Sequence, residues 1–192
     1  MLLDLTSPLS ITVGVVIGAV LMLPVIGTLF PRKFDYKDKH VLVTGGSSGI
    51  GLEVAREYLR RGANVTIMAR DKKKLEAAKN ELAKSDAALS FRVCCAAGDT
   101  GSSLEAVQKA LIPCIKAFGD VDVLINCAGT SVAGAFDTLD VSEFDRMLKV
   151  NVLGSVYPTR AVLEGMKKKK GGRIVFVASQ VAQVCFSYYY GY

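Results

Sequence analysis

A strand–turn–helix pattern at residues 41–61 constrains the fold of this chain more than any other feature of its sequence. The run Val41-Leu42-Val43 is typical of a buried strand, and a glycine-rich run at 44–51 (TGGSSGIG) follows it directly. Residues 50–61 then have the pattern of a helix, and Gly62 predicts where it ends. A glycine-rich turn between a strand and a helix is the arrangement with which α/β proteins hold a diphosphate.

The glycines of this turn have separate expected tasks. Gly45 takes backbone angles that other residues avoid, Gly49 lets the chain approach a pyrophosphate closely, and Gly51 lets the helix pack against the strand. The free N–H groups and the partial positive charge of the helix N-terminus then favour phosphate. We therefore predict a dinucleotide site formed by Gly45, Ser47, Ser48, Gly49, Ile50 and Gly51.

Short apolar runs alternate with helical patterns through the rest of the chain. Further strands are expected at 65–69, 89–95, 121–126 and 173–178, and helices at 72–84, 103–118 with a kink at Pro113, and 142–168 with a break at Pro158. Nearly uniformly apolar strands that alternate with helices predict a parallel sheet covered on both faces. The expected fold class is therefore α/β, a Rossmann-like doubly wound parallel sheet.

The residue after the second strand bears on the choice of coenzyme. An NAD site usually has an acidic residue there, which binds the ribose 2′-hydroxyl. Here the strand NVTIMA ends at Ala69 and is followed by Arg70. A guanidinium suits a 2′-phosphate, so the sequence favours NADPH over NADH. Asp71 is adjacent, and it keeps NADH open as the alternative.

The N-terminal residues predict a membrane anchor. No charged residue lies from Leu5 to Pro31, and a helix of about 20 apolar residues crosses the hydrocarbon layer. We expect an anchor at 1–31 and an NADP(H)-binding domain at 32–192. The alternative is a cleaved signal peptide, which would need a positive n-region and a shorter apolar run. Arg32 and Lys33 follow the run, which predicts a single-pass protein with its domain in the cytosol.

Charge and cysteine content exclude some function classes. The net charge of +6 suits an anionic coenzyme or membrane surface, or is ordinary surface charge. The basic residues are spread along the chain without a recognition motif, so no nucleic-acid partner is expected. The five cysteines form no disulfide framework, which predicts a reducing compartment and cysteines packed as small apolar side chains. His40 is the single histidine, so no metal site is expected, and its role is expected to be structural.

Together these motifs resemble the short-chain dehydrogenase/reductase family over residues 40–192. The run TGGSSGIG resembles the family's TGxxxGIG turn, and NCAG at 126–129 resembles its NNAG segment, with Cys127 in place of the second Asn. Asp99-Thr100 resembles the pair that holds the adenine. By this resemblance, Asp99, Asn126, Ala128 and Gly129 join Arg70 as coenzyme-binding residues.

The resemblance also implies the catalytic residues. Asn151 matches the family's central-helix asparagine, and Ser179 ends the fifth strand, where the family has its serine. Spacing from that serine assigns the proton-donating tyrosine to Tyr192, while the tyrosines at 188–190 remain alternatives. The family's lysine would lie beyond Tyr192, so we expect the chain as printed to have an incomplete sheet at its C-terminus and weak or no activity.

Within the family, the apolar N-terminus and the segments 66–75 and 154–158 resemble reductases of the endoplasmic reticulum membrane. Those enzymes use NADPH to reduce the 3-keto group of the first long-chain base in sphingolipid synthesis. The resemblance therefore implies a long-chain keto-base lipid substrate, a membrane-bound protein and, as in many family members, a homodimer. Two alternatives stay open: a membrane-anchored hydroxysteroid or retinol dehydrogenase, and a truncated, non-catalytic isoform.

Overall fold

A computed structural model describes residues 34–84, 86–180 and 189–190, and the elements discussed below belong to the unit that spans residues 36–192. The anchor expected at 1–31 lies outside the described residues. Within the described ranges, no helix is long and apolar enough to span a bilayer.

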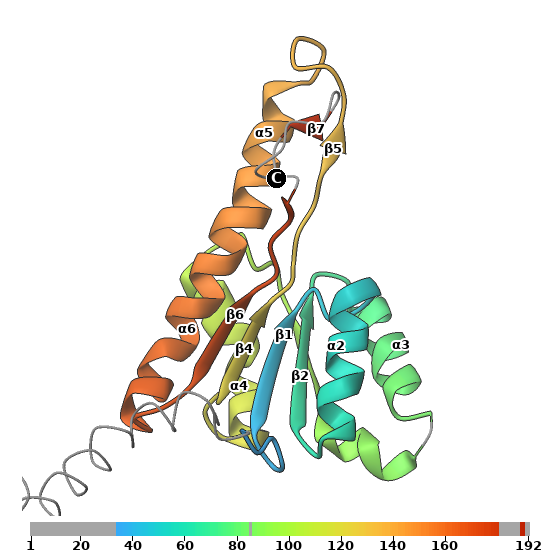
Figure 1. The fold of residues 1–192 in the computed structure, drawn as a ribbon, viewed down its shortest axis with the longest axis vertical. Helices are drawn as coiled ribbons and strands as arrows, with labels where there is room; N and C mark the ends of the chain where they lie inside the picture. The colour runs from blue at the N-terminus through green and yellow to red at the C-terminus, as the bar shows by residue number, and fades with distance from the viewer. Residues whose placement is uncertain (1–33, 85, 181–188, 191–192) are drawn as a thin grey trace, which may run out of the picture. The chain divides into compact units, whose positions relative to one another are not determined.

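Five parallel strands form the central sheet, in the order β3-β2-β1-β4-β6 (Figure 1). They are β1 (His40–Thr44), β2 (Asn64–Ala69), β3 (Val93–Ala97), β4 (Val123–Asn126) and β6 (Arg173–Phe176). Strand β1 pairs with β2 on one side and with β4 on the other, so the order of the strands reverses there. In such sheets, ligands bind at the carboxyl ends of the strands beside the reversal.

Helices cover both faces of this sheet, as the sequence predicts. They are α2 (Gly49–Arg60), α3 (Lys72–Leu82), α4 (Leu104–Phe118) and α6 (Gly154–Lys168). In Figure 1, α2 and α3 lie together to one side of the sheet, and α4 and α6 lie together on the other. Because both faces are covered, β1 is buried at every position, which explains its continuous apolar run.

One core cluster fills the space between the sheet and the helices α4 and α6. Its residues from the two layers are Leu42, Met68, Ala96, Val107, Leu111, Cys114, Val121, Leu124, Val162 and Met166. Burial of these side chains positions the strand ends, because each strand contributes to the same packed layer. The α/β Rossmann-like parallel sheet expected from the sequence is confirmed.

The third strand starts later than predicted. Residues 89–92 were expected in the strand, but they belong to a 3₁₀ helix, η1 (Ala87–Arg92). The Asp86 carboxylate accepts a hydrogen bond of 2.8 Å from the N–H of Ala88, which stabilises the turn that begins η1. The strand therefore occupies 93–97. An antiparallel pair that the sequence did not predict, β5 (Val132–Ala133) and β7 (Tyr189–Tyr190), lies outside the main sheet.

The long helical region is interrupted upstream of the place predicted. It consists of α5 (Val141–Met147), a π-helical segment η2 (Leu148–Leu153) and α6, so the interruption is η2 and not Pro158. Pro158 is buried inside α6. A proline clashes with the carbonyl four residues earlier, which here belongs to Gly154, where π geometry changes to α. The widened segment therefore accommodates the proline, and helix α4 likewise continues through Pro113.

The cysteines are not all packed as free thiols, so that expectation was wrong. Cys94 on β3 and Cys114 on α4 form a disulfide, with their Cα atoms 5.7 Å apart. The pairing joins the sheet to the helix that covers it. The two residues become neighbours only when α4 folds back over β3. Their separation of 20 residues in the sequence therefore does not predict the disulfide. Within the described ranges, Cys95 and Cys127 are free thiols.

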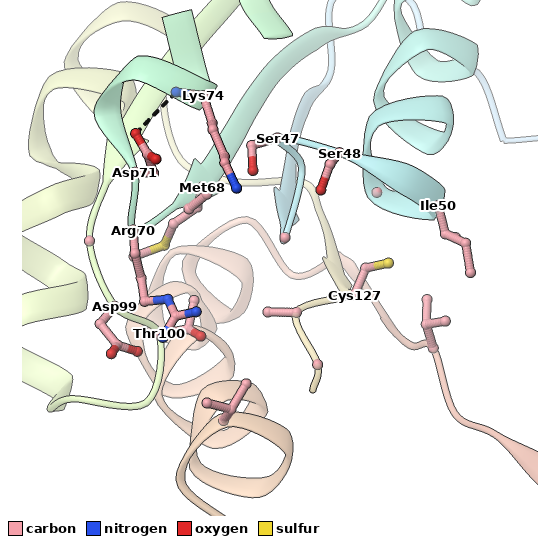
Figure 2. Close-up of a pocket in the computed structure, with 18 residues that line it drawn as sticks. Ser47, Ser48, Ile50, Met68, Arg70, Asp71, Lys74, Asp99, Thr100 and Cys127 are labelled. Carbon is pink, nitrogen blue, oxygen red and sulfur yellow. Dashed lines mark hydrogen bonds between the residues drawn. The ribbon is translucent and has the colours of Figure 1, made fainter. Parts of the chain in front are cut away.

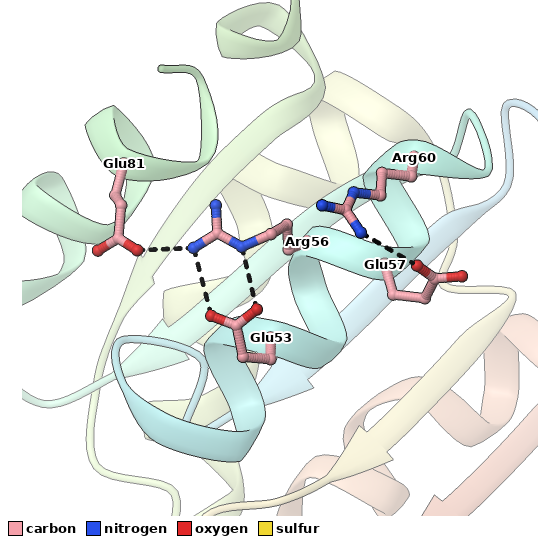
Figure 3. Close-up of polar contacts among 5 residues, drawn as sticks. All are labelled: Glu53, Arg56, Glu57, Arg60 and Glu81. Carbon is pink, nitrogen blue, oxygen red and sulfur yellow. Dashed lines mark hydrogen bonds and ion pairs between the residues drawn. The ribbon is translucent and has the colours of Figure 1, made fainter. Parts of the chain in front are cut away.

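Ion pairs connect α2 to α3 on the outer surface (Figure 3). Arg56 bridges the two helices, since its guanidinium lies 3.1 Å from a Glu53 oxygen and 2.6 Å from a Glu81 oxygen. Arg60 and Arg61 both pair with Glu57 on α2. Exposed pairs of this kind contribute little stability individually, but the Arg56 bridge helps to fix the register of α3 against α2.

His40 is fully buried at the start of β1 and makes two side-chain hydrogen bonds. Its Nδ1 lies 2.6 Å from the carbonyl oxygen of Gly119, and its Nε2 lies 2.8 Å from the hydroxyl of Thr66. Because a carbonyl only accepts, Nδ1 carries the hydrogen, and the Thr66 hydroxyl donates to Nε2 of the neutral ring. Burial lowers the pKa of His40, although the hydrogen bond to Gly119 opposes this shift. These contacts fit the structural role expected from the sequence.

Acid should therefore destabilise the fold through His40. Below the ordinary histidine pKa of about 6.5, the unfolded chain binds a proton that the folded chain resists, so stability falls as pH falls. The loss is at most about 1.4 kcal/mol per pH unit for one proton and levels off below the lowered pKa of His40. Urea unfolding between pH 5 and 8 measures it. In His40→Gln this pH-dependent part should disappear; an unchanged pH dependence would contradict the assignment.

Candidate functional site

A pocket of about 420 Å³ lies at the carboxyl ends of β1, β2 and β4 (Figure 2). This is the edge of the sheet where the strand order reverses. The pocket is lined by Gly45, Ser47, Ser48, Ile50, Gly51, Met68, Ala69, Arg70, Asp71, Lys74, Gly98, Asp99, Thr100, Cys127, Ala128, Gly129, Val150 and Val177. The structure therefore brings together most of the coenzyme-binding residues predicted from the sequence.

The glycine-rich turn is tight enough that two of its positions require glycine. Gly45 has a φ of 67°, and a Cβ atom there would lie 2.9 Å from the Cα of Ala128. A Cβ atom at Gly51 would overlap the carbonyl oxygen of Gly45. The turn is therefore packed against both the segment after β4 and the first turn of α2, as predicted for Gly51.

Gly49 differs, because it faces open space. Its φ is 55°, and a Cβ atom there would meet nothing within 4 Å. Ser48 is the N-cap of α2, but its side chain makes no capping hydrogen bond, and the first turn of α2 contains no acidic residue. The first N–H groups of the helix thus remain available to an anion at a positive dipole end. These features fit the diphosphate of a dinucleotide.

Thr44 joins the two strands that flank the reversal. Its hydroxyl oxygen accepts hydrogen bonds from the N–H groups of Cys127, at 3.0 Å, and Ala128, at 3.1 Å. Thr44 is fully buried. The contact fixes the start of the NCAG segment against the end of β1, so that Ala128 and Gly129 reach the pocket wall.

The segment after β3 forms the far wall of the pocket. The Asp99 carboxylate accepts a 2.9 Å hydrogen bond from the N–H of Gly101, and Thr100 is buried beside it. A Cβ atom at Gly101 would overlap the carbonyl oxygen of Lys149, so this segment packs directly on η2. Such a wall suits the flat adenine that the resemblance assigns to Asp99.

Five predicted residues do not line this pocket, and Asn151, described below, is one of them. Asn126 is buried behind it, where its side-chain N–H donates to the Thr159 hydroxyl at 3.2 Å. Ser179 follows β6, two residues after Val177, which does line the pocket. Gly49 lies in the turn between the lining residues Ser48 and Ile50, and a Cβ atom there would face open space. Tyr192 lies outside the described residues, and the catalytic roles of Ser179 and Tyr192 stay predictions.

Asn151 occupies the π-helical segment and holds the loop after β4. Its side-chain oxygen accepts from the N–H of Thr130 at 2.8 Å, and its side-chain N–H donates to the Thr130 carbonyl at 2.9 Å. Short π segments often occur at functional sites, because the extra residue redirects a side chain. Here the redirected amide pairs with the backbone directly after Gly129.

Several pocket residues were not predicted. Val150 and Val177 are brought in by tertiary packing alone, and no local motif indicates them. Lys74 is one of three consecutive lysines, at 72–74, and only the helical register of α3 separates it from the other two. Cys127 was noticed as a departure from the NNAG pattern, which was the available signal.

Comparison with known proteins identifies the family. A model of the short chain dehydrogenase family matches residues 39–192, which is most of the chain. The chain belongs to the short-chain dehydrogenase family. Members of this family are oxidoreductases, and their fold implies a nicotinamide coenzyme at the end of the first strand. The match includes every pocket residue named above.

Relatives within the short-chain dehydrogenase family include sphingolipid enzymes. The chain is 41% identical over 177 residues to "3-dehydrosphinganine reductase" of Danio rerio, covering 92% of the chain and 53% of that protein. It is 40% identical over 171 residues to "3-ketodihydrosphingosine reductase" of Mus musculus, covering 89% of the chain and 52% of that protein. It is also 32% identical over 174 residues to "Dehydrogenase/reductase SDR family member 7B" of Danio rerio, covering 90% of the chain and 56% of that protein. The chain thus spans about half the length of these relatives.

Solved short-chain dehydrogenases have the same fold. A crystal structure of a short chain dehydrogenase from Bacillus anthracis superposes with a TM-score of 0.72 at 27% sequence identity. The match covers 80% of this chain and 62% of that one. The arrangement of strand, glycine-rich turn and helix is therefore that of experimentally determined members of the family.

The thiol of Cys127 should report on occupation of the pocket. Cys127 lines the pocket, and burial raises the pKa of its thiol, as burial also does for Cys95. Both should therefore react slowly with an alkylating reagent. NADPH at about ten times its Kd should slow alkylation of Cys127 about tenfold, if the bound form is inaccessible. Cys95 is the internal control, since it does not line the pocket; mass spectrometry of labelled peptides measures both. Equal labelling of Cys127 with and without NADPH would contradict the assignment.

Proposed function

We propose that this protein catalyses the NADPH-dependent reduction of 3-ketodihydrosphingosine to dihydrosphingosine, a step of sphingolipid synthesis. The observation that carries the proposal is identity of about 40% over about nine tenths of the chain with relatives that bear this enzyme's name. A membrane-anchored hydroxysteroid or retinol dehydrogenase remains the second candidate, because such enzymes share the apolar N-terminus and the glycine-rich turn.

Charge at the end of β2 supports NADPH as the coenzyme. Arg70 directly follows β2 and lines the pocket. A guanidinium can hold a phosphate through two parallel N–H bonds, whereas the ribose 2′-hydroxyl of NADH calls for a carboxylate. The neighbouring carboxylate, Asp71, accepts hydrogen bonds from the N–H groups of Lys73 and Lys74 at the start of α3.

Reduction of a ketone requires a hydride on carbon and a proton on oxygen. NADPH supplies the hydride when bound. In the proposed mechanism the Ser179 hydroxyl donates a hydrogen bond to the ketone oxygen, and the Tyr192 hydroxyl donates the proton. The ordinary pKa of tyrosine, about 10, is high for this task near neutral pH, so a nearby cation must stabilise the phenolate. Asn151 positions the loop after β4 through its paired bonds to Thr130.

We further propose that residues 1–31 anchor the protein in the endoplasmic reticulum membrane, with residues 32–192 in the cytosol. The support is the uncharged run before Arg32 and Lys33. Carbonate extraction and protease protection of microsomes test it. The proposal fails if the protein is released by carbonate or if its domain is protected from protease.

A homodimer is also proposed, because one side of η2 and α6 carries an exposed apolar stripe. Leu148, Val152 and Val156 recur every fourth residue and are 59%, 51% and 44% exposed. Such a stripe suits packing against the same helix of a second copy. Light scattering tests this proposal. The wild-type protein is expected to be a dimer, and the Val152→Glu variant is expected to be a monomer. A wild-type monomer would refute it.

Consumption of NADPH with two ketones tests the proposed reaction. The purified chain, in mild detergent, is given 3-ketodihydrosphingosine or a steroid ketone, and product is measured by mass spectrometry. In line with the weak activity expected from the sequence, the proposal expects slow formation of dihydrosphingosine and no steroid product. Reduction of the steroid ketone alone would support the second candidate. Coenzyme binding without either product would support the non-catalytic alternative, and both of these outcomes contradict the proposal.

A further inference from the structure

Three charged residues that follow β2 line the pocket, and the two lysines among them in the sequence do not. Arg70, Asp71 and Lys74 contribute to its wall, whereas Lys72 and Lys73, which carry the same charge as Lys74, do not. Figure 2 shows the Lys74 side chain extending from α3 into the pocket. The helical register of α3 therefore selects one lysine out of three consecutive ones.

The Asp71 carboxylate binds backbone N–H groups at the start of α3. Asp71 is the N-cap residue of α3, and one carboxylate oxygen accepts from the N–H of Lys73 at 2.8 Å and from the N–H of Lys74 at 3.2 Å. The positive end of the helix dipole favours the carboxylate in this position. An acidic residue that recognises an NADH ribose needs its oxygens for the 2′-hydroxyl, so the cap disfavours that role for Asp71.

Arg70 alone does not make this end of the pocket positive. Asp71 and Asp99 line the same pocket, so two carboxylates accompany Arg70 there. A phosphate monoester carries a charge between about −1.5 and −2 at pH 7, so a single guanidinium leaves negative charge uncompensated. Lys74 adds a second cation to the wall of the pocket.

The backbone that carries Lys74 is well fixed. The next residue, Leu75, is 1% exposed and anchors α3 to the core, and the ion pair between Arg56 and Glu81 ties the far end of α3 to α2 (Figure 3). A lysine on a fixed helix needs to order only its own side chain to reach a ligand, which lowers the entropic cost of binding.

We infer that Lys74 is a second determinant of coenzyme specificity, which binds the adenosine 2′-phosphate of NADPH together with Arg70 while Asp71 caps α3. The inference rests on the NADPH preference proposed above and deepens it. Lys74 acts on the phosphate that distinguishes the two coenzymes and takes no part in hydride or proton transfer.

Calorimetry with two nucleotide fragments tests the inference without turnover. Adenosine 2′,5′-bisphosphate carries the distinguishing phosphate, and adenosine 5′-monophosphate lacks it. Lys74→Ala should weaken binding of the bisphosphate about fivefold, the size expected for one exposed ion pair, and leave the monophosphate unchanged. Lys74→Arg should bind like wild type. Lys73→Ala is the matched control and should change neither ligand, because Lys73 does not line the pocket.

The outcomes separate this inference from the proposal beneath it. Bisphosphate binding by Lys74→Ala equal to wild type would overturn the role of Lys74, and so would an equal loss for both ligands. If Arg70→Ala still weakened binding of the bisphosphate and not of the monophosphate, the proposed NADPH preference would hold even though the role of Lys74 had been refuted. Wild-type protein that binds both fragments equally would overturn the preference and the inference together.

Discussion

Replacing Gly49 with alanine is expected to weaken NADPH binding strongly while the protein remains folded. The φ of 55° imposes a strain of about 1 kcal/mol on a residue with a Cβ, but among the described residues no atom beyond the chain neighbours and the backbone of α2 lies within 4 Å of that Cβ. The added methyl group instead occupies the space where we place the diphosphate, against the first turn of α2. We expect affinity to fall at least about a hundredfold, since close approach of backbone and diphosphate is lost.

Gly62 provides the matched control at the other end of α2. It also has a positive φ, of 78°, and its added Cβ would make only ordinary contacts, the nearest at 3.5 Å to Lys37. Gly62→Ala should therefore lose a similar amount of stability but bind NADPH like wild type. Urea unfolding and fluorescence titration measure the two effects. Normal binding by Gly49→Ala, or an equal loss in both variants, would contradict the site.

Replacing Thr44 with valine should lower the free energy of unfolding by about 2 to 3 kcal/mol and weaken coenzyme binding. Valine keeps the shape of threonine but leaves the N–H groups of Cys127 and Ala128 without their acceptor. Because those groups lie at the end of β4, their loss should also loosen the pocket wall. Urea unfolding gives the free energy, and NADPH titration gives the affinity.

Thr138→Val controls for the loss of a threonine hydroxyl in itself. Thr138 is exposed and donates a 3.0 Å hydrogen bond to Ala135 in a loop, so its replacement should change stability by less than about 0.5 kcal/mol. If Thr44→Val unfolded at the same urea concentration as wild type, the link between β1 and β4 would have no energetic role.

Local patterns predicted the elements whose signal is contained in a few residues. The apolar run of β1, the glycine-rich turn and the helix up to Arg60 could be predicted because turn geometry, packing and helix capping act within that segment. The third strand was misplaced, since Asp86 stabilises a 3₁₀ helix that competes for the same apolar residues. The interruption of the long helix was assigned to Pro158, because proline is the visible signal and a π segment has none.

Contacts between distant segments account for what sequence reasoning missed at the site. Cys94 and Cys114 meet only after α4 packs on β3, and Val177 reaches the pocket only through the pairing of β4 and β6. Asn126 was grouped with the pocket on its motif, yet its position on a buried strand turns it toward Thr159. The sequence does not distinguish Lys74 from Lys72 and Lys73; only the register of α3 shows that Lys74 is the one that lines the pocket.

A crystal structure of the NADPH complex tests the central claim most directly. We expect the diphosphate against the first N–H groups of α2, the adenine beside Asp99 and the 2′-phosphate at Arg70. Coenzyme bound elsewhere, or no bound coenzyme in crystals of folded protein grown with saturating NADPH, would contradict the account.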